Sequence, residues 1–155
     1  MNFETEAKKL FDRIGESCYM VLATCDGNYP LRSTMTCLVF DGCVWMQTDK
    51  KFAKYTQILN NPQTALVKGA TQLEGKTYIC GHPFEEQNRK FCELIKKYHP
   101  ESYEMYSKVD TEVVLKFVPE KAVDWLYEAG SSDIYNYDFI NKTVSIQKYK
   151  NGKDK

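Results

Sequence analysis

Apolar residues recur at intervals of three and four positions in several segments of the chain, which places them on one side of an amphipathic helix. The clearest case runs from Phe3 to Ile14 and stops at Gly15, a residue typical of helix ends. Similar spacing returns in later segments, one of which breaks at Pro100. We therefore expect helices over residues 3–14, 50–59, 83–98 and 101–107.

Other segments are short apolar runs or alternate between apolar and polar positions, which is the pattern of β-strands. Two turn signals, Asp26-Gly27-Asn28 and Asp41-Gly42, join the first three into a meander of hairpins. Gly69 and Gly75 interrupt the next two, where a bulge or a barrel bend would fit. The strand candidates are 18–25, 30–40, 43–48, 64–68, 71–80, 112–118, 122–127 and 143–149.

With six or seven of these segments as strands and few helices between them, the pattern favours a barrel over a doubly wound parallel sheet. The length of 155 residues suits one compact domain. We expect a mostly β (α+β) protein, with residues 1–155 forming a six-stranded split β-barrel that carries peripheral helices.

Charge, the first residues and the cysteine spacing each exclude a class of partner or site. Lys plus Arg and Asp plus Glu number 21 each, so no overall field favours nucleic acid or an anionic membrane. The first residues include acids and no continuous apolar run, which predicts a cytoplasmic protein without a membrane span. No cysteine pair has the C-x-x-C spacing of a metal site, so we expect the six cysteines to act as small hydrophobes and expect no metal.

The segment from Gln47 to Lys54 is the strongest candidate for chemistry. It joins the third strand to a helix start, where unpaired N–H groups and the helix dipole favour an anion. Lys50 and Lys54 are four positions apart, so on a helix they would share a face and reach the same anion. The alternative is a solvated, lysine-rich first turn.

Arginine is scarce, with three residues against eighteen lysines. Because a guanidinium binds phosphate or carboxylate through two parallel hydrogen bonds, each arginine is a candidate for such a contact. Arg32, Thr34 and Thr36 fall on one face of the second strand, opposite Ser33 and Met35. A three-stranded meander could bring this polar face beside the helix start. The alternative for Arg32 is an exposed strand residue paired with a carboxylate.

An ordered set of motifs over roughly half the chain resembles the pyridoxamine 5'-phosphate oxidase-like FMN-binding split-barrel family. The set is Pro30-Leu31-Arg32-Ser33-Thr34-Met35, Asp41-Gly42, Gln47-Thr48, Lys54, Leu59, Asn61-Pro62 and, more loosely, Leu73-Glu74-Gly75.

The resemblance implies a cofactor, its binding residues and an assembly. FMN would be the cofactor, with Arg32 and Lys54 on its phosphate. The ribityl chain and the edge of the isoalloxazine would be held by Ser33, Thr34, Gln47 and Thr48. Members of the family form homodimers with each FMN in a groove at the subunit interface.

The chain also departs from the family pattern. Phe52 and Ala53 stand where the helix often begins with Ser and Arg or Lys, which implies a weaker grip on phosphate. No arginine follows Arg89, whereas true pyridoxamine phosphate oxidases end in an arginine-containing substrate motif. The resemblance is therefore closer to the general stress protein and nitroimidazole-resistance groups, and we do not expect pyridoxamine phosphate oxidase activity.

Three functions remain open on the sequence. The first is an FMN-dependent oxidoreductase acting on an unidentified small molecule, in which the cofactor carries the redox step and no catalytic side chain can be named. The second is a flavin-binding sensor or carrier without turnover. The third is a haem-binding split barrel, which the two histidines, His82 and His99, make the weakest of the three.

Overall fold

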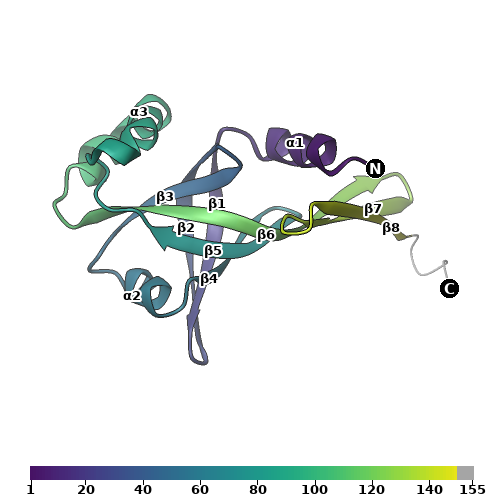
Figure 1. The fold of residues 1–155 in the computed structure, drawn as a ribbon, viewed down its shortest axis with the longest axis horizontal. Helices are drawn as coiled ribbons and strands as arrows, with labels where there is room; N and C mark the ends of the chain where they lie inside the picture. The colour runs from purple at the N-terminus through teal and green to yellow at the C-terminus, as the bar shows by residue number, and fades with distance from the viewer. Residues whose placement is uncertain (150–155) are drawn as a thin grey trace.

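The computed structural model describes residues 1–149, and an antiparallel eight-stranded sheet dominates it (Figure 1). The sheet order is β3-β2-β1-β4-β5-β6-β7-β8, and β3 also pairs with β6, which closes the first six strands into a barrel. The predicted fold class is therefore confirmed. The strands are β1 (Ser17–Asp26), β2 (Tyr29–Phe40), β3 (Cys43–Asp49), β4 (Gln63–Lys68), β5 (Thr71–Ile79), β6 (Glu112–Glu128), β7 (Ser131–Asp138) and β8 (Thr143–Tyr149).

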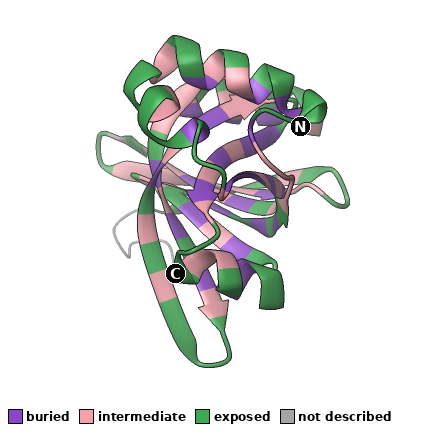
Figure 2. Ribbon diagram, turned by 90° about the vertical axis from the view of Figure 1, so that its left-hand side faces the viewer, coloured by how far each residue is buried: buried purple, intermediate pink, exposed green. Residues whose placement is uncertain are grey.

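Alternation along the strands fills the barrel. Every second side chain of β1 to β6 points inward, and Figure 2 shows the buried residues on the strands at the centre of the molecule. Leu and Met side chains make up much of this core, and Phe117 closes it from β6. Its largest members are Met20, Leu22, Met46, Leu66, Leu73, Leu115 and Phe117.

The sequence prediction of two late strands, 112–118 and 122–127, is wrong, because β6 is one continuous strand. Pro119, which lacks a donor for the ladder, pairs with Gly75 at the point where the register of β5 and β6 shifts. A Cβ added at Gly75 would lie 2.1 Å from the carbonyl oxygen of Val118. The bulge expected at Gly75 thus lets β6 pass the proline without ending.

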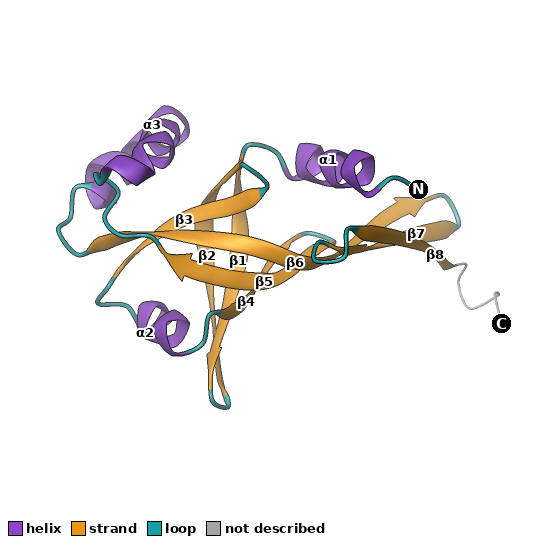
Figure 3. Cartoon of the chain, in the orientation of Figure 1, coloured by secondary structure: helices purple, strands orange, loops and turns teal. Residues whose placement is uncertain are grey.

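Two strands extend the sheet beyond the barrel. β7 and β8 add to the second half of β6, as the right-hand side of Figure 3 shows. β8 was predicted, whereas β7 was missed because its sequence, SSDIYNYD, is polar at most positions and lacks a clean alternation.

The helices lie around the barrel. α1 (Phe3–Ile14) has its predicted bounds and ends at Gly15, whose φ of 89° favours glycine. The helices predicted at 50–59 and 83–98 begin later than expected, as α2 (Ala53–Asn60) and as η1 (Glu86–Asn88) followed by α3 (Arg89–Tyr98). The short helix predicted at 101–107 is present as α4 (Pro100–Ser102) and the π-helical η2 (Tyr103–Ser107). No helix within residues 1–149 is long and apolar enough to cross a membrane.

Arg13 fastens α1 to the strand extension. Its guanidinium donates two hydrogen bonds to one oxygen of Asp124 on β6, at 3.0 and 2.7 Å. The other oxygen accepts from the hydroxyl of Thr71 at 2.7 Å. Asp124 is only 2% exposed, so its charge depends on these donors.

Replacing Asp124 with Asn should destabilise the fold by about 3 kcal/mol, because one buried partner of an ion pair is lost. This is the lower end of the usual range, since the Arg13 side chain keeps 35% of its exposure. Urea unfolding measures the difference. Asp12→Asn, which breaks the exposed pair with Lys8, is the control and should cost less than about 1 kcal/mol. Equal losses in the two variants would contradict the structural role of Asp124.

Candidate functional site

A groove of about 420 Å³ lies where the start of α2 meets strands β2, β3 and β6. Its far wall comes from the α4–η2 segment and the loop that follows. The residues that line it are Thr34, Met35, Thr36, Gln47, Thr48, Asp49, Phe52, Lys54, Ser102, Met105, Tyr106, Val109 and Glu112. Four of the six residues predicted to bind the cofactor are thus brought together, namely Thr34, Gln47, Thr48 and Lys54.

The β3–β6 ladder positions one wall of the groove. Gln47 pairs with Val114, and Asp49 pairs with Glu112. The side-chain oxygen of Gln47 accepts a hydrogen bond from the hydroxyl of Ser107 at 2.9 Å. This bond orients the amide and leaves its NH₂ group able to donate to a molecule in the groove.

The start of α2 supplies backbone donors. The helix begins at Ala53, and its N-cap Phe52 provides no side-chain bond. The N–H groups of Ala53 and Lys54 have no partner within residues 1–149, as expected for a first turn. Lys50 lies in the turn before the helix, where its N–H donates to Thr111, so the prediction that Lys50 and Lys54 share a helical face is wrong.

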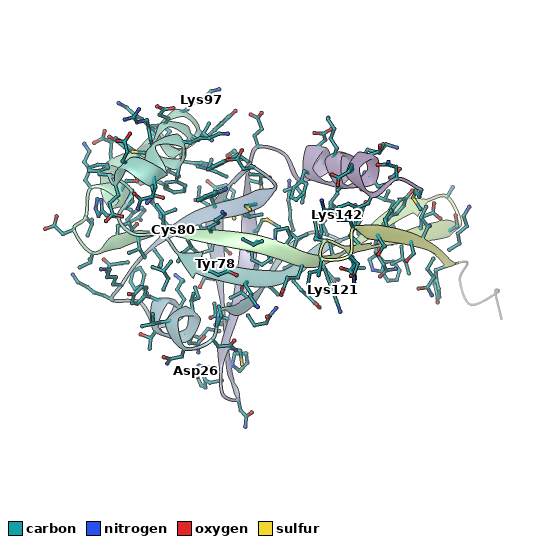
Figure 4. The ribbon with its side chains drawn as sticks, in the orientation of Figure 1. Asp26, Tyr78, Cys80, Lys97, Lys121 and Lys142 are labelled. Carbon is teal, nitrogen blue, oxygen red and sulfur yellow. The ribbon has the colours of Figure 1, made fainter. Side chains whose placement is uncertain are left out.

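The other end of α2 is tied to the barrel by amide side chains. Gln57 accepts from the hydroxyl of Thr24 at 2.6 Å and donates to the carbonyl of Tyr29 at 3.0 Å. Asn60 donates to Asp26, which Figure 4 labels near the tip of the β1–β2 hairpin, at 2.9 Å. The N-terminus of α2 is therefore held in a fixed place over the groove.

Lys54 brings a positive charge into the groove. Its Nζ lies 5.0 Å from the centre of the Phe52 ring, a cation–π distance. Burial lowers the pKa of this amine, and the nearby Glu112 carboxyl opposes the shift. An anionic group bound here would favour the charged form of the amine, which burial disfavours.

Glu112 is a groove residue that the sequence analysis missed. Its side chain is 5% exposed, and burial raises its pKa from 4.5 to about 7, with the Asp49 charge adding to the shift and Lys54 opposing it. The Asp49 carboxylate accepts from the N–H of Lys51 at 2.9 Å, and this bond is the main cause of its lowered pKa. Glu112 was missed because only the ladder with β3 reveals that it lies opposite Asp49.

Arg32 and Ser33, the other two predicted residues, do not line the groove. Arg32 is exposed on the outer face of β2, two positions before Thr34, or about 7 Å along the strand. It has no ion pair or hydrogen bond within the described chain, unlike the other two arginines. Ser33 alternates with these residues and pairs with the buried Leu22, so its side chain points to the barrel interior.

One polar atom of the groove wall is left without a partner. The hydroxyl oxygen of Thr48 is buried and forms no hydrogen bond within residues 1–149. A buried hydroxyl in this state costs about 1–3 kcal/mol. The groove wall therefore has an unsatisfied hydrogen-bonding group at the end of β3, next to the lysine-rich turn.

The far wall of the groove is apolar. Met105, Tyr106 and Val109 are exposed large side chains, and Phe52 faces the same space from the helix start. The sequence predicted a short helix at 101–107 but indicated no role for it. The hydrophobic spacing of this segment could not reveal a groove wall, because these side chains pack on no core.

The histidines lie outside the groove. His82 accepts from the N–H of Phe84 at 3.0 Å, and its other ring nitrogen lies 2.9 Å from the carbonyl of Val109. His99 is bonded to the hydroxyl of Ser17 at 2.6 Å. Within residues 1–149 no group of three or more His, Cys, Asp or Glu side chains could hold a metal ion.

The backbone is similar to solved structures of small proteins. General Stress Protein 26 from Bacillus anthracis aligns with a TM-score of 0.59 and 21% identity, over 76% of this chain and 91% of that one. A NimC/NimA family protein from Clostridium acetobutylicum aligns with a TM-score of 0.55 and 16% identity, over 93% and 94%. HutZ, the heme storage protein from Vibrio cholerae, aligns with a TM-score of 0.61 and 14% identity, over 77% and 92%.

No protein-family model and no curated protein sequence matches the chain. The structural likeness, at these identities, shows the fold. The chain has the pyridoxamine 5'-phosphate oxidase-like split-barrel fold, as the sequence resemblance predicted.

Glu112→Gln should stabilise the protein at pH 8 relative to the wild type, and much less at pH 4. The carboxyl has a raised pKa in the folded state, so its ionisation removes stability as the pH rises from 4.5 through about 7. The amide of the variant cannot ionise, so the variant loses no stability at this position as the pH rises. Thermal unfolding at both pH values measures the difference, with the exposed Glu101→Gln as the control, expected to change stability by less than about 0.5 kcal/mol. A constant difference between E112Q and wild type across this range would contradict the raised pKa.

Proposed function

We propose that the protein is an FMN-binding flavoprotein whose groove holds the cofactor with its phosphate at the start of α2. One observation carries the proposal: free N–H groups, the Lys54 amine and the polar side chains of Thr34 and Gln47 meet in one groove. A helix N-terminus with a lysine is a favourable site for a phosphate.

The size and chemistry of the groove suit a flavin. Its volume of about 420 Å³ is within the usual range for cofactor pockets. The polar wall of β2 and β3 would bond the ribityl chain and the ring edge, as the family resemblance implies for Thr34, Gln47 and Thr48. Phe52, Met105 and Tyr106 would pack against the flat isoalloxazine, whose apolar faces favour aromatic and sulfur contacts.

Arg32 is proposed to bind the FMN phosphate and Ser33 the rest of the cofactor, and the structure supports the two roles unequally. Arg32 shares the outer face of β2 with Thr34 and has no carboxylate partner within residues 1–149, so its guanidinium is available to the phosphate. The Ser33 side chain points to the interior, so a contact with FMN would have to come from its backbone. Support for Ser33 is therefore the weaker of the two.

We also propose a homodimer with the flavin at the subunit interface. An apolar strip formed by Tyr19 and Val21 of β1 and Val67 of β4 leads to the groove. Val21 pairs with Val67 on one side and with the groove residue Thr34 of β2 on the other. Tyr19 and Val67 on this face are 64% and 36% exposed. A second copy packed on the strip would cover it and border the cofactor.

Catalysis would belong to the flavin, which can cycle between oxidised and reduced forms, while the protein binds and orients it. The proposed reaction is FMN-dependent oxidation or reduction of an unidentified small molecule in the cytoplasm. A sensor or carrier would bind FMN equally well but would never oxidise a nicotinamide donor with any acceptor, which separates the two.

Haem is the alternative ligand, because HutZ shares the fold and is named a heme storage protein. His82 uses both ring nitrogens within the protein, and neither histidine faces the groove. An axial histidine would therefore require rearrangement. A haem spectrum after reconstitution would reverse this preference.

The double variant Arg32→Ala, Lys54→Ala should weaken FMN binding by several kcal/mol, because each charge-assisted bond to phosphate contributes about 1.5–3 kcal/mol. Fluorescence titration with FMN measures the change. The control is Arg89→Ala, Lys97→Ala, which removes the same charge away from the groove, as Figure 4 shows for Lys97 on α3. Unchanged affinity in the first variant, or an equal loss in both, would reject this position for the phosphate.

The wild-type protein should sediment as a dimer of about 36 kDa, twice the chain mass of 18.0 kDa. Val67→Glu should shift it to the monomer, because a charge would be buried in the strip. Ile140→Glu, at an exposed apolar residue in the β7–β8 turn, should leave the dimer intact. A wild-type monomer in the presence of FMN would contradict the proposed assembly.

A further inference from the structure

Glu112 is an unusual residue for a groove that binds a phosphate. It is almost completely buried and lines the groove beside Thr48 and Lys54. Its backbone N–H donates to the carbonyl of Val109, but its carboxyl group has no hydrogen-bond partner within residues 1–149. A carboxylate in this position would repel the anion that the helix start and Lys54 attract. Its protonation state therefore bears directly on what the groove can hold.

The β3–β6 ladder sets Glu112 directly opposite a second carboxyl, that of Asp49. Side chains of directly opposed residues lie about 5 Å apart, and like charges there destabilise the pair. Asp49 accepts the N–H of Lys51, which holds it in the charged form. Glu112 has no such donor, so it is the member of the pair that takes the proton.

The charged groups around Glu112 come from each element packed on it. Asp49 faces it from β3, and Lys54 faces it from α2. Lys50 and Lys51, in the turn before α2, and Asp110, in the loop before β6, are exposed to solvent. One cation and one anion thus face Glu112 at close range, so no excess of positive charge compensates its ionisation.

We propose that Glu112 must be protonated for the groove to hold a phosphate monoester, so that binding takes up a proton at this carboxyl. The inference rests on the proposed function, because it concerns the same phosphate position. As a neutral acid, Glu112 offers an O–H donor to a phosphate oxygen and removes a negative charge from its surroundings. The proton comes from solvent, and no covalent bond changes.

The raised pKa gives the expected size of the effect. With a value of about 7, roughly half of the Glu112 carboxyls are ionised at pH 7, so FMN binding should take up about half a proton. Between pH 6 and pH 8 the protonated fraction falls about tenfold, and the affinity falls with it. The second ionisation of the phosphate, near pH 6, acts in the opposite direction by about twofold.

Isothermal titration calorimetry with FMN, in two buffers of different ionisation enthalpy, measures the proton uptake. The wild type should take up about half a proton at pH 7 and bind about fivefold more weakly at pH 8 than at pH 6. Glu112→Gln keeps the shape of the side chain and a hydrogen-bond donor. This variant should take up no proton, and it should bind FMN up to about twofold more tightly at pH 8 than at pH 6. Glu101→Gln, at an exposed residue that does not line the groove, should behave as the wild type.

Riboflavin, which lacks the phosphate, is the matched ligand. Its binding should show no proton uptake in the wild type, because nothing negative is placed beside Glu112. Equal proton uptake with riboflavin and FMN would overturn the inference, since the uptake would then not depend on the phosphate.

The outcomes separate this inference from the proposed function. FMN binding with the same pH dependence in wild type and E112Q would overturn the role of Glu112 and leave the flavin site intact. Absence of FMN binding by both proteins at every pH would instead reject the flavin site. The wild-type uptake needs no variant, so the test does not depend on how E112Q folds.

Discussion

The ladder between β3 and β6 is the interaction on which the rest of the structure depends. It closes the barrel by joining strands more than sixty residues apart, and it sets Gln47 and Asp49 against Val114 and Glu112. Without this closure the helix start after β3 and the α4–η2 segment before β6 would not face each other. The same pairing therefore makes the core continuous, forms the groove and places two carboxyls beside a lysine.

Much of the fold could be predicted because local chemistry specifies it. The Asp41-Gly42 turn fixes the β2–β3 hairpin, with Asp41 and Gly42 at φ values of 53° and 68°. Period-two alternation places Thr34 and Thr36 outside the barrel, and helical spacing gives α1 its bounds. The free N–H groups beside a lysine at the start of α2 were also predictable, since a strand followed by a lysine-bearing helix start is a local feature.

Features that depend on distant pairing could not be predicted. Pro119 resembles the end of a strand until Gly75, on another strand, is seen to make room for it. Lys50 was placed on α2 because periodicity cannot locate a helix start to within one turn. Glu112 resembled an ordinary first residue of a strand, and its environment became visible only through its partner Asp49. The groove thus combines a signal present in the sequence with an acid that only the fold reveals.

The central claim is that the groove holds FMN, and the visible absorption spectrum of the purified protein tests it most directly. The protein should show the absorption bands of an oxidised flavin, or acquire them when FMN is added. Mass spectrometry of the ligand released on heating should then identify FMN. A colourless protein whose spectrum does not change on titration with FMN, or a haem spectrum in its place, would contradict the account.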